Sequence, residues 1–247
     1  AVTARSVHHL MKVVAGVPLR RPVWFFDVNE YGDGLADVGT HVVDLVQWTA
    51  FPRDSIDYKK DIRILNARRW PTVISKSDFE RVTGEPQFPA SLAAHVKDGK
   101  LEYECNNAIR YTVRGAHLAL DVRWNWESAD GDIYEASFRG TKSRIDLRQG
   151  AVQRFVPELY VVSQDASVFA GLDRWATAMQ KSYPGLGVEH HDKEARVVIP
   201  QKFRVGHEDH FGQVTNIFFD YLKNPASMPD WELSNMMVKY FVTTSGN

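Results

Sequence analysis

The chain has 247 residues, of which 44% are hydrophobic and 25% charged, with a formal net charge of −1 at pH 7. This composition is average for a globular protein, and the near-zero charge excludes a general electrostatic attraction to nucleic acid or to an anionic membrane. Cys105 is the single cysteine, which excludes an internal disulfide framework and a cysteine-based zinc site. No apolar run approaches the ~20 residues that span a bilayer, and the first residues lack the apolar core of a signal peptide. We therefore expect no membrane partner and a cytoplasmic location, with the periplasm as the alternative.

The first segment, residues 4–14, mixes apolar and basic residues at roughly helical spacing and stops at Gly16-Val17-Pro18. This pattern predicts a helix. We assign residues 1–20 to a lead-in helix from a preceding domain. Residues 21–247 contain no repeat of fixed period and no Gly/Ser linker, which favours a single domain.

The next segments alternate between strand and helix patterns. Branched and aromatic residues predict a strand over residues 23–30. Apolar residues at helical spacing predict a helix from about residue 35 to the Phe51-Pro52 break. A strand over residues 61–70 and a short helix or turn over 75–84, capped by Ser75 or Ser77, follow.

From residue 100 to residue 150 the hydrophobic period changes to two, which is typical of an antiparallel sheet with one buried face. The residues expected on the buried face of residues 116–127 are Leu118, Leu120, Val122, Trp124 and Trp126. Helical patterns return at residues 166–181, 211–223 and 231–244. The order predicts an α+β fold, a large and mostly antiparallel open sheet with helices on one face. Because no βαβ series is present, the chain is not itself a nucleotide-binding sheet.

Asp37, His41 and Asp44 form the sharpest polar pattern, at the start of the helix predicted from residue 35. Spacings of four and seven place the three side chains on one side of an α-helix. A carboxylate one turn before an imidazole can fix its tautomer and raise its pKa, as a general acid/base requires. The alternative is a purely structural role for both residues. Asp37 would then be a first-turn acid stabilised by the helix dipole, and His41 an ordinary neighbour one turn later. Asp44 either orients His41 or points to solvent.

Metal binding is not expected. A rigid helix rarely supplies three ligands alone, which argues against a metal on the Asp37 helix. The pair His190-His191 and the run His207-Glu208-Asp209-His210 lack the H-E-x-x-H spacing of zinc peptidases.

The segment GDGLADVGTHVVDLVQW, residues 32–48, resembles the start of the C-terminal domain in the Gfo/Idh/MocA family, the relatives of glucose–fructose oxidoreductase and inositol dehydrogenase. Its glycine-rich turn leads into D-x-x-x-H-x-x-D and an apolar helix that ends in Trp. FRGTKSRIDL, residues 138–147, is similar to the later strand–turn–strand of the family, and residues 210–241 to its last two helices. The set is in the family's order and covers most of the chain.

The resemblance implies an oxidoreductase that uses NAD or NADP, bound mainly by a Rossmann domain absent from this chain. It implies that His41 assists proton removal from a sugar-like or polyol hydroxyl and that Asp37 binds or orients the substrate. It also suggests substrate contacts at His210, near the entry of the penultimate helix, and sequence proximity suggests the same for Tyr31. The exposed sheet face of the family implies a homo-oligomer. Without a G-x-G-x-x-G motif or a Lys-Pro pair, this chain alone is expected to be inactive.

Two alternatives stay open at this point. One is a glycoside hydrolase of the same superfamily, which would retain NAD through its cycle. The other is a non-catalytic carbohydrate-binding or assembly module that has kept the sheet and lost the chemistry.

Overall fold

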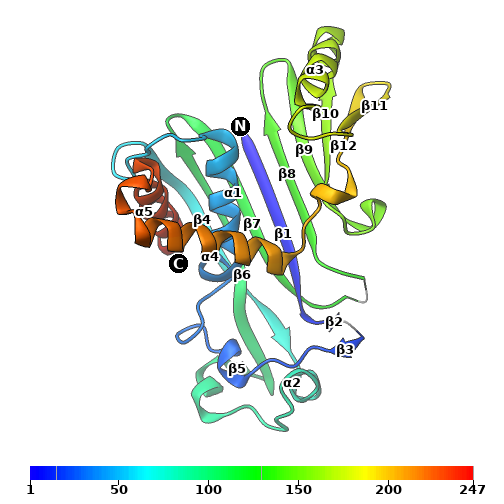
Figure 1. Ribbon diagram of the computed structural model, residues 1–247. Coiled ribbons are helices and arrows are strands. Elements are labelled where there is room, and N and C mark those ends of the chain that lie inside the picture. Colours follow the sequence, from blue (N-terminus) through cyan, green and yellow to red (C-terminus); the bar gives the residue numbers. More distant parts are fainter. Residues whose placement is uncertain (15, 129, 247) are drawn as a thin grey trace.

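A computed structural model describes residues 1–14, 16–128 and 130–246, with the backbone alone at residues 14, 207 and 208 (Figure 1). Ten strands form one open sheet in the order β11-β12-β10-β9-β8-β1-β7-β6-β4, with β5 paired to β6. Of these pairs only β1 and β7 are parallel. The strands are β1 (Val2–Met11), β4 (Ile62–Ile74), β5 (Val96–Lys97), β6 (Lys100–Val113), β7 (Ala116–Glu127), β8 (Ile133–Arg139), β9 (Ser143–Gln149), β10 (Glu158–Ser163), β11 (Gly187–His191) and β12 (Glu194–Val198), besides a small hairpin of β2 (Val13–Val14) and β3 (Val17–Pro18). The predicted α+β class is confirmed.

The helices agree closely with the predicted periodicity. They are α1 (Thr40–Ala50), α2 (Lys76–Thr83), α3 (Ala166–Met179), α4 (His207–Lys223) and α5 (Asp230–Thr244), with short turns η1 (Val23–Phe26), η2 (Leu35–Gly39), η3 (Ala90–His95), η4 (Ala151–Gln153), η5 (Gln201–Phe203) and η6 (Pro225–Ser227). Ser75 caps α2 as predicted, because its hydroxyl accepts the Asp78 N–H at 3.1 Å. No helix within the described ranges is long and apolar enough to cross a membrane.

The predicted helix over residues 4–14 is wrong. Residues Val2–Met11 form β1, which lies inside the sheet between β7 and β8. Its burial alternates at first: Val2 and Ala4 are in the core, whereas Thr3 and Arg5 are exposed. From Ser6 onward almost every residue is buried, and a continuous apolar run fits a helix as well as a central strand.

The predicted strand over residues 23–30 is also wrong. Residues Val23–Phe26 form the 3₁₀ turn η1, which follows Pro22. Phe25 and Phe26 are consecutive, yet they are only 4% and 2% exposed, and their rings pack edge to face at 5.4 Å. A strand would send neighbouring side chains to opposite faces, so a tight turn is the way to bury both on one side.

One face of the sheet carries the helices. Val42, Val46 and Val242 of α1 and α5 are buried against this face, and they join one hydrophobic cluster with Leu118 and Leu120 of β7. The predicted alternation in β7 is confirmed, since Leu118, Leu120, Val122 and Trp124 are each at most 5% exposed. The opposite face is open and highly charged; its side chains include Arg5, Arg110, Asp121, Arg144, Asp146 and Arg148.

Helix α4 stands apart from this packing. In Figure 1 it crosses in front of the helix-bearing side of the sheet, between η5 and α5. Apart from Tyr221, the described side chains of this helix are exposed. They include the apolar residues Val214, Ile217, Phe218 and Leu222, each at least 47% exposed. An uncovered apolar side of this size is unusual for a monomeric domain.

Candidate functional site

The glycine-rich turn before α1 is fixed to the sheet by Asp33. One oxygen of its buried carboxylate accepts the N–H groups of Leu35 and Ala36, at 3.0 and 3.1 Å. The other accepts the side-chain N–H of Asn107 on β6 at 2.9 Å. Gly34 lies so close to β6 that a Cβ there would collide with the backbone carbonyl of Cys105. The turn therefore needs both this carboxylate and this glycine.

Asp37 lies in a widened helical turn. η2 is a π-helical turn, closed by a hydrogen bond of 2.8 Å from Gly39 N–H to the Gly34 carbonyl, and it continues into α1. π-helical turns are rare in proteins, and many of those that occur lie at functional sites. Because the turn is wider than an α-helical one, the simple spacing argument for Asp37 and His41 holds only approximately.

The Asp37 carboxylate is largely buried. Its Oδ2 is inaccessible and accepts no hydrogen bond from the residues that the structure describes. Burial raises the pKa of Asp37, while the interactions with Tyr31, His8, His41 and Arg21 act against that rise. Burial and the neighbouring Asp37 together raise the pKa of Tyr31 to about 12, so the phenol stays protonated at neutral pH. A buried carboxylate oxygen without a hydrogen-bond donor is unusual in a folded protein, and it marks Asp37 as a candidate functional group.

His41 and Asp44 have different surroundings. The His41 side chain is exposed, one turn beyond Asp37, and makes no hydrogen bond with the described side chains. Asp44 accepts a hydrogen bond of 2.8 Å from Lys239 on α5. Asp44 therefore joins two helices instead of orienting His41 or pointing to solvent. Asp37 and His41 are electrostatic neighbours, which keeps them as the candidate pair.

Sequence reasoning missed the floor of the site. His8 of β1 stacks against Trp124 of β7, with ring centroids 5.0 Å apart. The Arg21 guanidinium lies 4.2 Å from the centroid of Phe25 and 4.8 Å from that of Trp124. It donates hydrogen bonds to the backbone carbonyls of Leu10 and His9, at 2.7 and 3.0 Å. His8 and Phe25 come from segments for which the wrong secondary structure was predicted, so the direction of their side chains could not be foreseen.

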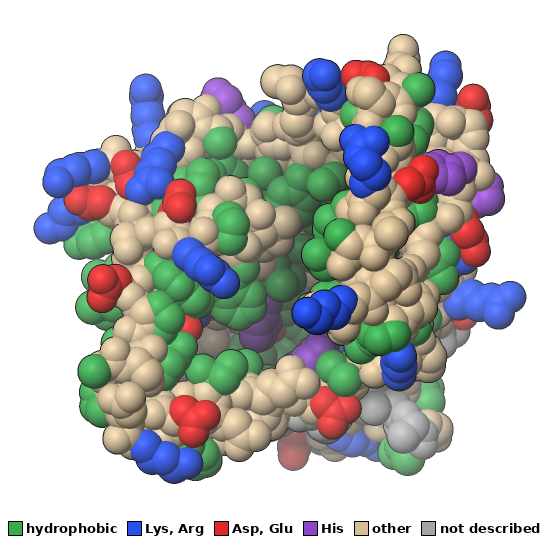
Figure 2. Space-filling model, turned by 45° about the horizontal axis from the view of Figure 1, so that its top comes forward, with side chains coloured by type: hydrophobic (Ala, Val, Ile, Leu, Met, Phe, Trp, Pro, Cys, Tyr) green, Lys and Arg blue, Asp and Glu red, His purple; other side chains and the backbone are tan. Residues whose placement is uncertain are grey.

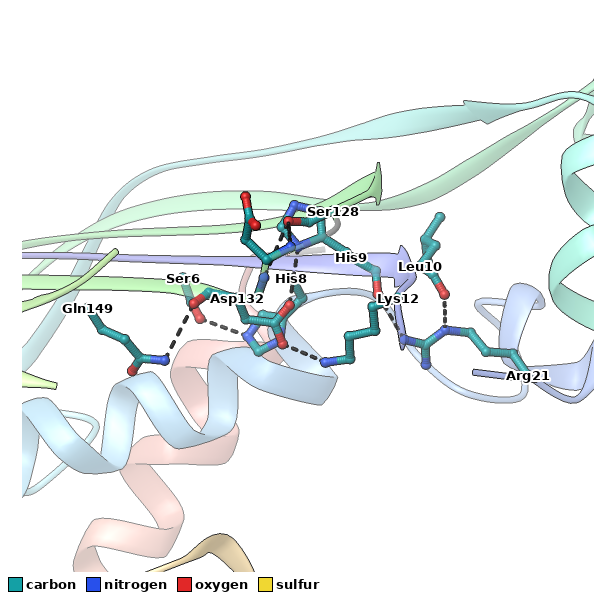
Figure 3. Close-up of polar contacts among 11 residues, drawn as sticks. Ser6, His8, His9, Leu10, Lys12, Arg21, Ser128, Asp132 and Gln149 are labelled. Atoms are coloured by element: carbon teal, nitrogen blue, oxygen red, sulfur yellow. Dashed lines mark hydrogen bonds and ion pairs between the residues drawn. The ribbon is translucent and has the colours of Figure 1, made fainter. Parts of the chain in front are cut away.

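His8 belongs to a polar network around Asp132, in the loop before β8 (Figure 3). One oxygen of Asp132 lies 3.1 Å from His8 Nδ1 and 2.6 Å from Lys12 Nζ, and the other lies 3.2 Å from His9 Nδ1. His8 Nε2 is 2.8 Å from the Ser6 hydroxyl. Although burial alone would raise it, hydrogen bonds from His8 and Lys12 hold the pKa of Asp132 well below its usual range. Asp132 is therefore an ionised acceptor at neutral pH.

The other predicted site residues are placed as follows. Tyr31 packs on Phe25, with ring centroids 4.4 Å apart, and lies beside Asp37. His210 is exposed in the first turn of α4 and shows no contact with Asp37. The His207 side chain lies outside the described residues. His190 pairs with Asp173 at 2.8 Å. No cluster of three metal-ligating side chains occurs in the described part of the chain.

Figure 2 shows that the helix-bearing side of the molecule is hollowed. Histidine and hydrophobic side chains are visible deep in the hollow, whereas lysine, arginine and acidic side chains lie mostly around its rim. A hollow with few polar groups at its base is the usual form of a small-molecule site.

An open, mostly antiparallel sheet with an Asp-x-x-x-His segment over one face is the architecture expected of an oxidoreductase C-terminal domain. The chain belongs to the family described as "Putative oxidoreductase C terminal domain", which matches residues 1–247. The predicted resemblance to oxidoreductases of the Gfo/Idh/MocA type is confirmed.

Solved structures support the assignment. The chain is similar to the crystal structure of a putative oxidoreductase from Parabacteroides merdae ATCC 43184, with 43% identity and a TM-score of 0.95 over 100% of this chain. It spans 57% of the length of that protein. A putative oxidoreductase from Erwinia carotovora atroseptica shares the fold, with a TM-score of 0.54 and 13% identity over 99% of this chain and 54% of its own. No curated protein matches the chain.

Proposed function

We propose that this chain is the substrate-binding half of an NAD(P)-dependent oxidoreductase that acts on a sugar or polyol hydroxyl. The observation that carries the proposal is the Asp37 carboxylate, buried in a widened turn with one oxygen free of partners. An uncompensated buried carboxylate oxygen costs about 1–3 kcal/mol or more of stability. A substrate hydroxyl would remove that cost once the turn opens enough for the hydroxyl to reach this oxygen.

The residues around Asp37 suit the removal of a hydroxyl proton. Because the pKa of Asp37 is raised toward neutral pH, its carboxylate is a better base than that of an exposed aspartate. The phenol of Tyr31 forms a side-chain hydrogen bond with Asp37 and so helps to hold the carboxylate in place. His41 is exposed one turn away, where it can exchange a proton with the same hydroxyl or with solvent. We assign Asp37 to substrate binding and to removal of the hydroxyl proton, assisted by His41, with Tyr31 as a further contact.

The cofactor itself does not fit this chain. The sequence has no G-x-G-x-x-G motif, and the one parallel strand pair among the described residues, β1 with β7, is not joined by a βαβ crossover with a glycine-rich phosphate loop. We therefore assign NAD or NADP to a separate Rossmann domain. A bound nicotinamide would supply the hydride acceptor or donor, while the residues of this chain bind the substrate and manage its proton.

The exposed surface around the hollow is consistent with such a domain. Leu45 and Trp48 follow His41 along α1 and are 42% and 49% exposed, and the apolar side of α4 is uncovered as well. We propose that the Rossmann domain covers this side and brings its cofactor to Asp37. The isolated chain is then inactive, although its substrate site is formed.

The open sheet face is the proposed oligomer contact. It carries a shallow concavity of about 1000 Å³ lined by charges of both signs, among them Arg5 and Asp121. A face that pairs its own arginines with its own aspartates can also pair them across a two-fold axis. Light scattering of the intact protein tests this, because a monomer at micromolar concentration would contradict it.

The function is tested with the protein that includes its N-terminal domain. Nicotinamide absorbance is followed with a panel of sugars and polyols, first for the wild type and then for Asp37→Asn. We expect this change to lower kcat/KM by about 10²-fold or more, since it removes the base. Asp44→Asn is the matched control, because Asp44 is a half-buried aspartate of the same helix, and it should retain activity within a few-fold.

Other outcomes would redirect the proposal. Cleavage of a glycoside without net formation of reduced nicotinamide would identify the related hydrolase activity. Sugar binding without any nicotinamide-dependent reaction would identify a binding module.

A further inference from the structure

His8 lies on the same side of the sheet as Asp37. Successive residues of a strand project to opposite faces, and Ala4 of β1 is in the core beneath α1. Ser6 and His8 therefore project to the helix-bearing face, whereas His9 projects to the other face. The His8 side chain remains 23% exposed.

The tautomer of His8 follows from its partners. A carboxylate can only accept hydrogen bonds, and Asp132 is ionised, so His8 Nδ1 must be the donor at 3.1 Å. In the neutral ring, Nε2 then carries a lone pair, which accepts the Ser6 hydroxyl at 2.8 Å. An aspartate behind an imidazole in this way stabilises the imidazolium that forms when Nε2 takes a proton.

A continuous set of side chains joins His8 to Asp37. His8 contacts Trp124, Trp124 contacts Phe25 with ring centroids 5.6 Å apart, and Phe25 contacts Tyr31. Tyr31 lies beside Asp37. Of the two histidines that interact electrostatically with Asp37, His8 has the stronger effect, ahead of His41. His8 is thus closely coupled to the candidate base, although it lies 29 residues before it in sequence.

We propose that the Asp132–His8 pair receives the proton that Asp37 takes from the substrate hydroxyl and passes it to solvent. The inference rests on the proposed function. The substrate O–H bond breaks and its proton goes to the Asp37 carboxylate. The Asp37 O–H bond then breaks, the Ser6 hydroxyl turns away from His8 Nε2, and the proton goes to the Nε2 lone pair, which forms an imidazolium paired with Asp132. Water removes the proton from the imidazolium, and no further reactant is needed.

The test compares His8→Ala with His9→Gln in the intact protein. Both histidines bind the same carboxylate, but they project to opposite faces of the sheet. We expect His8→Ala to lower kcat by about tenfold to a hundredfold with KM changed less than threefold. His9→Gln should leave both within about twofold, after thermal unfolding shows that each variant is folded. Equal losses in the two variants would show that the network only holds the loop, and would overturn the proposal.

Chemical rescue separates proton transfer from packing. Imidazole added to His8→Ala should restore part of kcat, and rescue by substituted imidazoles should follow their pKa values. Rescue that is absent, or that follows only molecular size, contradicts the proposal.

A readout without turnover uses the 247-residue chain. The ring ¹⁵N shifts of His8 should show the Nδ1–H tautomer in the wild type and lose it in Asp132→Asn. An unchanged tautomer would remove the geometric basis of the proposal.

The proposed site at Asp37 and the proposed role of His8 can be tested separately. If Asp37→Asn keeps full activity, the proposed site itself is wrong. If Asp37→Asn is inactive while His8→Ala is fully active, only the role of His8 is wrong.

Discussion

Asp37 and Asp132 are aspartates of one site that have opposite surroundings. Asp132 accepts hydrogen bonds from His8, His9 and Lys12, and its side chain is 20% exposed. Asp37 has one oxygen that is buried without a partner. Burial acts to raise the pKa of both carboxyls, but at Asp132 the hydrogen bonds from His8 and Lys12 outweigh it and lower the pKa.

Asp132 is a carboxylate that stabilises the fold, whereas Asp37 has an oxygen to which the fold supplies no hydrogen-bond donor. A carboxylate with hydrogen-bond donors stabilises the protein most when it is ionised and held in one position. Asp132 is therefore suited to orienting His8 and His9. An unsatisfied carboxylate is a cost to the empty protein, and a ligand can remove that cost. The comparison therefore predicts that changes at the two positions move stability in opposite directions and affect activity through different steps.

The largest expected effect is on turnover and belongs to His41. Since its side chain is exposed and makes no hydrogen bond with the described side chains, His41→Ala should leave the free energy of unfolding within about 0.5 kcal/mol of wild type. Turnover of the intact protein should fall by about 10²-fold or more if His41 transfers a proton. Steady-state kinetics and urea unfolding measure the two quantities. Near-normal turnover would leave proton transfer to Asp37 and His8 and remove His41 from the mechanism.

The second effect is on stability and belongs to Asp132. Asp132→Asn removes the negative charge shared by Lys12 and two histidines, and at pH 7 it should lower the free energy of unfolding by about 2–3 kcal/mol, somewhat less than for a fully buried pair. Because the pKa of Asp132 is lower in the folded state, its contribution is present above the pKa of the unfolded chain, about 4. It is lost as the pH falls further. The difference between wild type and variant should shrink in acid. A difference that is independent of pH would mean that the effect arises from packing.

Much of the fold could be predicted from the sequence, because periodicity was clear where one face is buried. The alternation in residues 116–127 gave the correct buried face of β7, and the apolar spacing after residue 35 gave α1. Local sequence features also predicted Ser75 as the cap of α2 and identified Asp37 and His41 as a pair within a family motif. These features depend on near neighbours in the chain.

The rest depends on contacts that are remote in sequence. The central strand β1 is buried on both faces near its end, so its apolar run carries no period of two. η1 buries two adjacent phenylalanines, which looked like strand content. Strands β11 and β12, over residues 187–198, were not predicted at all. The network of Asp132 joins residues 120 or more positions apart, and no spacing rule could have shown that His8 lies near Asp37.

The smallest expected effect is also the most direct test of the contrast, and it belongs to Asp37. Because the pKa of Asp37 is raised in the folded state, the folded chain keeps its proton at a pH where the unfolded chain has lost it. Stability therefore declines as the pH rises from about 4, the pKa of an unperturbed aspartate, through the folded-state pKa. Asp37→Asn cannot titrate, so it should match wild type near pH 4 and exceed it at pH 7.5 by on the order of 1 kcal/mol. Urea unfolding at several pH values measures the gap. A variant that is less stable than wild type at pH 7.5 would show that Asp37 has a structural partner, and its low activity could then no longer be attributed to the loss of a base.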